Sequence, residues 1–266
     1  MLNRQYFNLL VWIAATVVAV CSCASEVQEL SAYWDGHDFS SLSGFDDIDV
    51  AEDKFDGYIN LLTQARHEDA VASMTAFLDS ASHNVVAYMV WSSWFEPYLH
   101  AKESPYRNDR LFKVWLDKVL ADEIIDDGAM MGHLEHLKAV LDKNIAGAPL
   151  QDVALFDENG EELMISDLVG ERMLILMVDA DCPSCLKSLE DNAKEYKKTK
   201  LVAVLVGGSR LHIDNIRRQM PESVLKDWIL VCGSRRKMEG EGLYDLTYLP
   251  TRLLVSPKGL IIKSYH

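Results

Sequence analysis

The chain has 266 residues, of which 49% are hydrophobic and 25% are charged, and its formal net charge is -15. This composition provides enough apolar surface for one large domain or two ordinary ones. An acidic surface repels nucleic-acid phosphates, so the charge argues against a protein that binds nucleic acid.

The N-terminal segment has the pattern of an export signal. Arg4 is the only charged residue among the first 25, and the apolar core that follows it is too short for an ordinary membrane span. Small Ser22 precedes Cys23 in a run that resembles a bacterial lipobox, whereas Cys21 follows a bulky valine and is the poorer candidate. We therefore expect a signal peptide over residues 1–22 and a lipid anchor on Cys23. The alternative is a retained signal anchor, and both deliver the chain to the outer side of the inner membrane.

The next part of the chain predicts a tether and then a helical domain. Residues 23–49 are acidic and interrupted by glycine and serine, which predicts a tether with a few ordered turns. From residue 50 to residue 146 apolar side chains recur at three- and four-residue steps, which predicts an all-α domain. Asp109 and Asp127 are the expected helix starts within it. The expected helical stretches are Phe55 to Leu62, Val71 to Leu78, Val85 to Leu99, Leu111 to Val119 and Met130 to Leu141.

Two patterns in this helical domain have both a structural and a functional interpretation. The dense aromatic residues from Tyr88 to Tyr98 could line a ligand groove, but large aromatic side chains dominate protein cores, so we favour a helical core. His133 and His136 are three residues apart on a predicted helix and could hold a metal ion. No third ligand is in register with them, so we expect no metal site.

Cys182 and Cys185 form a Cys-x-x-Cys pair between an apolar run and an amphipathic run. The six apolar residues from Met173 to Val178 predict a strand buried on both faces, and the later pattern predicts a helix with one buried face. At such a strand-to-helix turn the free backbone N–H groups and the helix dipole favour a thiolate. We expect Cys182 to be the exposed nucleophile and Cys185 the resolving thiol that closes a redox-active disulfide, without another cofactor. Half of a zinc site is the alternative, but a second cysteine pair is lacking.

This arrangement resembles the thioredoxin fold, and more closely its extracytoplasmic TlpA- and ResA-like thiol–disulfide oxidoreductases. The resemblance covers about residues 147–266. It includes a leading hairpin that starts at Gly147-Ala148-Pro149 and a segment, Tyr248-Leu249-Pro250-Thr251, that is similar to the family's cis-proline segment. The resemblance implies that Pro250 lies against the dithiol and that its neighbours Leu249 and Thr251 help to bind a substrate chain as an added strand.

The helical region also resembles a known kind of domain. The runs Phe95-Glu96-Pro97-Tyr98-Leu99 and Ser104-Pro105-Tyr106-Arg107-Asn108-Asp109 are similar to a helical domain of unknown function that precedes thioredoxin-like modules in some secreted bacterial lipoproteins. The expected fold is therefore an α/β thioredoxin-like domain at the C-terminus behind an all-α domain. Strands that alternate with helices predict a mixed sheet. Because no closing helix follows the last strand here, we expect the helical domain to cover one face of that sheet.

Three features near the dithiol bear on its chemistry. Asp181 stands where the family usually has an aromatic residue, and Ser188 stands where TlpA- and ResA-like proteins commonly have a carboxylate. Because Asp179 and Asp181 oppose a thiolate on Cys182, we expect a reducing couple. The fifth cysteine, Cys232, ends an apolar run and is expected to be a buried small hydrophobe.

The expected function is that of an extracytoplasmic, lipid-anchored thiol–disulfide oxidoreductase. Its expected partners are protein thiols or disulfides in the cell envelope and a membrane reached through the lipid anchor, with no nucleic acid. The alternative is a non-catalytic binding or scaffold lipoprotein whose dithiol is structural.

Overall fold

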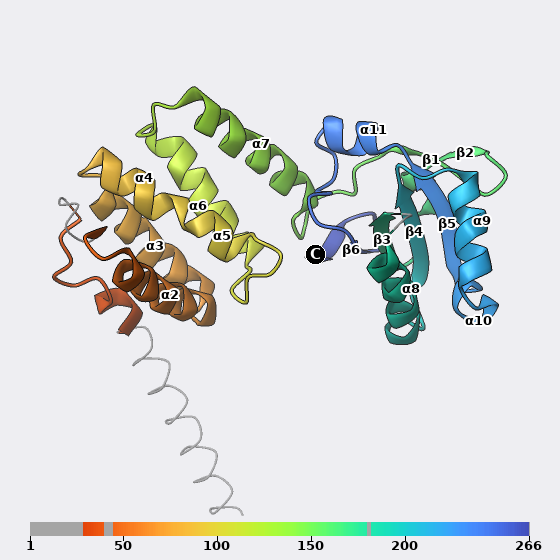
Figure 1. The fold of residues 1–266 in the computed structure, drawn as a ribbon, viewed down its shortest axis with the longest axis horizontal. Coiled ribbons are helices and arrows are strands. Elements are labelled where there is room, and N and C mark those ends of the chain that lie inside the picture. Colours follow the sequence, from red (N-terminus) through yellow and green to blue (C-terminus); the bar gives the residue numbers. More distant parts are fainter. Residues whose placement is uncertain (1–28, 40–44, 180–181, 266) are drawn as a thin grey trace, which may run out of the picture. The chain divides into compact units, whose positions relative to one another are not determined.

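The computed structural model of the chain describes residues 29–39, 45–179 and 182–265. These residues form two compact units, which divide after Met131 (Figure 1). The first unit is helical and the second is an α/β unit. The division falls inside helix α7 (Gly128–Asn144), ahead of the boundary expected after residue 146. Among the described helices, none has both the length and the apolar character needed to cross a bilayer.

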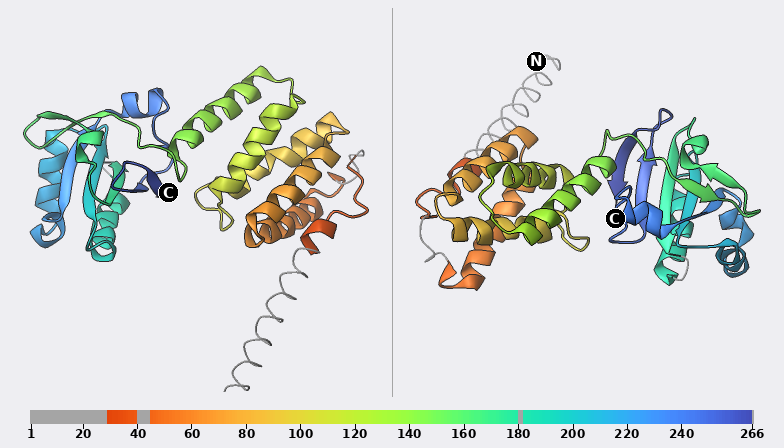
Figure 2. Two further views of the ribbon diagram at one scale, coloured as in Figure 1. Left: turned by 180° about the vertical axis from the view of Figure 1, so that it is seen from behind. Right: turned by 90° about the horizontal axis from the view of Figure 1, so that it is seen from above.

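The first unit is built from helices that lie alongside one another in Figure 1 and in both views of Figure 2. They are α2 (Ile48–Gln64), α3 (His67–Ala81), α4 (Val85–Ser93), α5 (Phe95–Leu99) and α6 (Asp109–Asp122). The predicted buried face of α2 is confirmed, since Phe55 and Ile59 are fully buried. Asp127 caps α7, as predicted, by accepting from the N–H of Met130 at 2.9 Å. At α6 the capping side chain is that of Asn108, one residue before the expected start.

The single helix expected from Val85 to Leu99 is two helices. Helix α4 ends at Ser93, and α5 begins at Phe95. Pro97 explains the break, because a proline has no N–H to donate to the carbonyl of Ser93. The same proline is tolerated in the first turn of α5, where backbone N–H groups have no helical partner.

The segment before α2 differs from the expected tether. Over its described residues 29–39, Leu30 and Phe39 are buried at 3% and 6% exposure. The Trp34 ring packs edge-on to Tyr58 and to Trp91, with centroids 5.3 Å and 5.4 Å away. Because these few apolar residues stand among acidic ones, the composition of the segment did not predict that they pack on the helices. The segment is part of the core of the first unit.

The second unit is organised on a seven-stranded mixed sheet with strand order β2-β1-β5-β4-β3-β6-β7. Its strands are β1 (Ala154–Phe156), β2 (Glu162–Met164), β3 (Met173–Asp179), β4 (Lys200–Val206), β5 (Trp228–Gly233), β6 (Thr251–Val255) and β7 (Ile261–Tyr265). The three central strands β3, β4 and β5 are parallel, and the outer strands are antiparallel to their neighbours. Six of the seven residues of β3 are buried, which confirms that this strand is covered on both faces.

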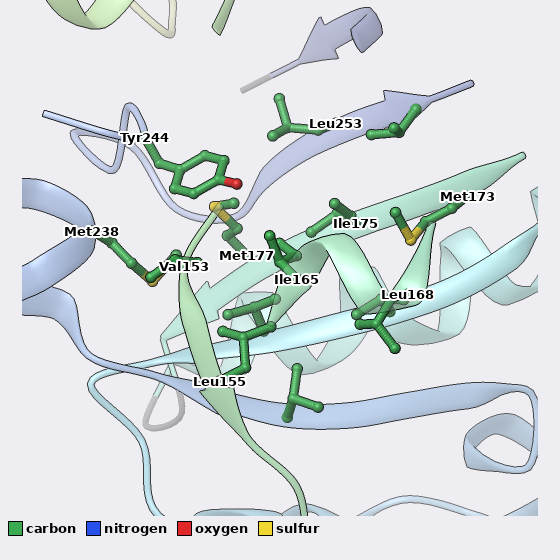
Figure 3. Packing of buried hydrophobic residues seen from close by; sticks show 14 of the residues in the cluster. Val153, Leu155, Ile165, Leu168, Met173, Ile175, Met177, Met238, Tyr244 and Leu253 are labelled. Carbon is green, nitrogen blue, oxygen red and sulfur yellow. The ribbon is translucent and has the colours of Figure 1, made fainter. Parts of the chain in front are cut away.

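Helices α8 (Pro183–Glu195) and α9 (Arg210–Gln219) cover one face of the sheet. The other face is covered by segments of the same unit, and Figure 3 shows Val153, Met238 and Tyr244 among the residues packed there. These segments include the short helices η2 (Ile165–Leu168) and α11 (Arg235–Gly240); a further short helix, α10 (Glu222–Leu225), precedes β5. Part of the cover expected from the helical domain is thus supplied by these segments of the second unit itself, which the sequence pattern did not reveal.

Candidate functional site

The Cys-x-x-Cys pair lies where strand β3 gives way to helix α8. Strand β3 ends at Asp179, and Cys182 is the N-cap of α8, with Pro183 in the first helical position. The N–H of Cys182 donates to the Asp179 carbonyl at 3.3 Å, and the N–H of Cys185 donates to the Cys182 carbonyl at 3.1 Å. The predicted strand-to-helix turn is confirmed. Both sulfurs are therefore carried by the first turn of a helix that rests on the central sheet.

The two thiols of this pair differ in exposure. Cys182 is half-buried, whereas Cys185 is fully buried, and both are free thiols. The pKa of Cys185 is raised to about 12, mainly by burial and in part by a side-chain hydrogen bond between Cys185 and Cys182. Cys185 therefore keeps its proton at neutral pH, and Cys182 is the sulfur that an approaching disulfide can reach.

The peptide bond between Leu249 and Pro250 is cis. Strand β6 starts one residue later and pairs antiparallel with β3, so that Thr251 lies opposite Met177. Continuing this register places Pro250 opposite Val178, next to the end of β3. Leu249 also packs against the hydrophobic cluster that Cys182 packs against. The proline segment, nearly seventy residues along the chain, is therefore beside the dithiol turn.

Thr251 has a structural role that the sequence did not indicate. It is buried at 1% exposure. Its hydroxyl lies 2.8 Å from the Tyr248 carbonyl and 3.2 Å from the Asp245 carbonyl, both of which are acceptors. The side chain therefore fixes the loop before β6, while the residues before it, Leu249 and Pro250, are half-buried.

Arg235 belongs to the site and was missed by sequence reasoning. It is the first residue of α11, and its Nη2 lies 3.2 Å from Oδ2 of Asp179. The Asp179 carboxylate also acts on Cys185 electrostatically and raises its pKa. The sequence carries no signal for this ion pair, because α11 was not predicted and the two residues are 56 positions apart.

The other residues singled out near the dithiol take separate places. Asp181 lies outside the described residues. The carbonyl of half-buried Ser188 accepts from Nδ2 of Asn192 at 2.7 Å. Glu190 pairs with Lys194 at 2.7 Å on the exposed side of α8. Of the two described positions, Ser188 therefore carries no carboxylate, and the carboxylate of Glu190 is paired with Lys194.

Cys232 is the remaining thiol among the described residues. It is 4% exposed near the end of β5, in the cluster that α8 and α9 cover. Burial raises its pKa to about 11. These surroundings fit the expected small hydrophobe, because a buried thiol of raised pKa is a poor nucleophile.

In the helical unit, two sequence patterns had a functional interpretation: the aromatic residues from Tyr88 to Tyr98, and His133 with His136. Tyr88, Trp91 and Phe95 are buried, which confirms the helical core. A cavity of about 580 Å³ in this unit is lined by other residues, from the segment 29–39 and from α3. Across the described parts of the chain, no group of three or more His, Cys, Asp or Glu side chains is placed to hold a metal ion.

Comparison with known proteins agrees with this division of the chain. Residues 30–144 match the family described as Domain of unknown function (DUF5106). A crystal structure of a thioredoxin-like protein from Bacteroides caccae superposes with a TM-score of 0.78 at 16% identity, covering 91% of this chain and 88% of the other. The chain thus has a thioredoxin-like fold at its C-terminus, behind a helical region that matches the DUF5106 model.

The thioredoxin-like domain also has a curated relative. Over 122 residues the chain is 29% identical to the thiol-disulfide oxidoreductase ResA of Bacillus subtilis (strain 168), a match that covers 44% of this chain and 65% of the relative. The chain thus spans about two thirds of the relative's length. The match supports the expected kinship of the thioredoxin-like domain, while the DUF5106 domain brings no known activity with it.

Proposed function

We propose that this protein is a lipid-anchored thiol–disulfide oxidoreductase of the cell envelope that reduces disulfides of other proteins through Cys182 and Cys185. The observation that carries the proposal is the placement of the two thiols at the start of α8, joined by a backbone hydrogen bond of 3.1 Å, one half-buried and one fully buried. An accessible sulfur next to a protected one is the arrangement that two-step disulfide exchange needs. The name of the curated relative supports the same activity.

The reaction begins with the Cys182 thiolate. It attacks one sulfur of a substrate disulfide, which breaks that bond, forms a mixed disulfide and releases one substrate thiolate. Cys185, once deprotonated, attacks the Cys182 sulfur, breaks the mixed disulfide and releases the second substrate thiolate. Two electrons pass to the substrate, and the two thiol protons of the pair end on the substrate thiols. A second protein dithiol must then reduce the Cys182–Cys185 disulfide.

The proline segment is the proposed contact for the substrate chain. Leu249 and Pro250 are half-buried and lie beside the turn that carries Cys182. An extended peptide placed along them would bring its disulfide to the accessible sulfur. Thr251 contributes by holding this segment through its buried hydroxyl.

The proposal that the dithiol acts as a reductant depends on the negative charge of Asp179. The carboxylate of Asp179 disfavours the thiolate form of its neighbours, and Arg235 offsets part of this effect. A pair whose thiolate is weakly stabilised has a less stable reduced form and therefore tends to give up its electrons. A measured reduction potential close to that of the dedicated periplasmic oxidants would contradict this part of the proposal.

The proposed location depends on the N-terminal segment. The signal peptide over residues 1–22 and the lipid anchor on Cys23 lie outside the described residues, so their support is the lipobox-like sequence. Labelling cells with a radioactive fatty acid tests the anchor. Label on the native chain and its loss in Cys23→Ser are expected, and equal label in Cys23→Ser would contradict the anchor.

Reduction of insulin disulfides tests the activity. We expect the native chain to accelerate precipitation of the reduced insulin B chain and Cys182→Ser to lose this acceleration, because Ser cannot form the mixed disulfide. Cys232→Ser is the matched control and should keep the native rate. Equal rates for the native chain and Cys182→Ser would instead favour the scaffold alternative, in which the dithiol is structural.

A further inference from the structure

The parallel strands of the thioredoxin-like domain bring two opposite charges to the dithiol. The carboxyl ends of β3, β4 and β5 meet at one edge of the sheet, because these strands are parallel neighbours. Asp179 stands at the end of β3, and Arg235 follows the end of β5 by two residues. Their side chains form an ion pair of 3.2 Å at this edge.

The backbone around Arg235 is built for this placement. A Cβ atom on Gly233 would lie 2.7 Å from Sδ of Met238, so the side chains of α11 pack closely on this end of β5. Ser234 caps α11 by accepting from the N–H of Lys237. Gly207, with φ of +73°, donates its N–H to the Gly233 carbonyl at 2.8 Å. The backbone from which the Arg235 side chain starts is therefore held at this edge of the sheet.

The charge on Asp179 bears on both thiols. Its carbonyl accepts from the N–H of Cys182, so the carboxylate is carried by the residue that anchors the first turn of α8. Its negative charge opposes ionisation of Cys185. By the same Coulomb repulsion it opposes a thiolate on Cys182, three residues along the turn. Any group that compensates this carboxylate therefore favours the attacking form of the dithiol.

Arg235 is the compensating group that the structure assigns. We propose that Arg235 is a positioning residue for disulfide exchange, because its guanidinium holds and neutralises Asp179 and thereby increases the fraction of Cys182 present as thiolate. The inference rests on the proposed function for its biological meaning, but it concerns the ionisation of the thiol and can be measured without turnover.

Among the described residues, Arg235 also has a second acidic neighbour. Oε2 of Glu239, one turn along α11, lies 3.8 Å from Nη1 of Arg235 and competes weakly for it. Lys187 on α8 is exposed. The side chains of Asp179 and Arg235 are 43% and 39% exposed, so water screens the pair and the effect on thiolate population is modest.

The test is the pH dependence of alkylation at Cys182, measured on the full chain with iodoacetamide and read by mass spectrometry on the peptide that holds Cys182. Arg235→Gln removes the positive charge beside the carboxylate, so we expect alkylation at pH 7 to slow by roughly threefold and the pH profile to move upward. Asp179→Asn removes the negative charge and leaves the guanidinium, so alkylation should quicken and the profile should move downward. The double variant should return towards the native profile.

Arg236→Gln is the matched control, because Arg236 is the next residue on α11, carries the same charge and is exposed. Its profile should coincide with the native one. A merely structural role for the ion pair would move both single variants in the same direction, and that result would overturn the inference. An unchanged profile in a folded Arg235→Gln variant would also overturn it. If the native chain fails to reduce insulin while the alkylation profiles of the two single variants still shift in opposite directions, the result contradicts the proposed function and leaves this inference standing.

Discussion

The two units of this molecule use their polar and aromatic residues in opposite ways. Residues 1–131 contain 21 acidic and 8 basic residues, whereas residues 132–266 contain 20 and 18, so nearly all of the net charge belongs to the helical part. The helical unit buries in its core the aromatic side chains that could have lined a ligand groove. The thioredoxin-like unit instead leaves one sulfur partly accessible at the edge of its sheet. The net negative charge of the chain therefore comes mainly from the residues of the helical part and not from the unit that carries the dithiol.

The largest expected effect is the loss of stability when the aromatic core of the helical unit is truncated. Trp91 is 1% exposed and contacts Phe55 and Phe77. Trp91→Ala should lower the free energy of unfolding by about 3–5 kcal/mol, because it leaves a cavity in the aromatic core. Urea unfolding followed by circular dichroism measures this change. Val86→Ala on the exposed face of the same helix should cost less than about 0.5 kcal/mol, and an equal loss in both variants would contradict a buried role for Trp91.

The second effect is a difference in alkylation rate between the described thiols. The pKa of Cys185 is raised to about 12 and that of Cys232 to about 11, so both keep their protons at pH 9 and cannot act as thiolates there. We expect iodoacetamide at pH 9 to label Cys182 about 100-fold faster than Cys232. Mass spectrometry of the labelled peptides gives both rates, with a urea-unfolded sample as the control in which the difference should vanish. Comparable labelling of the two in the folded chain would refute the contrast.

A third, smaller effect concerns the segment before α2. Trp34→Ala should destabilise the chain by about 2 kcal/mol, because the indole ring packs on the aromatic core. Asp35→Ala, on the exposed neighbour, serves as control and should change the stability by less than about 0.5 kcal/mol. Thermal unfolding measures both. A Trp34→Ala variant as stable as the native chain would restore the tether interpretation.

The smallest effect tests the start of the helix in which the two units divide. Asp127 accepts from the N–H groups of Ala129 and Met130 at 2.9 Å. Asp127→Ala should cost about 1 kcal/mol of stability, as expected for the loss of a helix cap. Asp126→Ala removes the same charge without the cap, so the difference between these two variants in urea unfolding isolates the hydrogen bonds. No difference would mean that the cap contributes nothing to stability.

The parts that the sequence predicted well are those whose cause is local. The strand, the turn and the helix around Cys182 follow from an apolar run, a proline in the first helical turn and an amphipathic run. The position of Pro250 beside this turn came from the family resemblance, since no local pattern brings residues so far apart together. The α2 face was predicted from its spacing of apolar residues.

The parts that escaped prediction depend on contacts between distant segments. The half-buried Trp34 ring packs on residues of α2 and α4, which composition alone does not reveal in an acidic stretch. Arg235 meets Asp179 because two parallel strands end at the same edge. Thr251 carries its hydroxyl into the protein to hold a loop. For Trp34 and Arg235 the deciding interaction is tertiary, whereas Thr251 bonds to carbonyls three and six residues before it in a loop that has no regular sequence pattern.

The most direct test of the central claim is to trap the mixed disulfide. The full chain with Cys185→Ser is incubated with a disulfide-bonded peptide, and the adduct is located by mass spectrometry. Because Cys182 can attack and no resolving thiol remains, the account predicts a stable adduct on Cys182, with release of one peptide thiol per chain. An adduct that forms on Cys232 instead, or no adduct on Cys182, would contradict it.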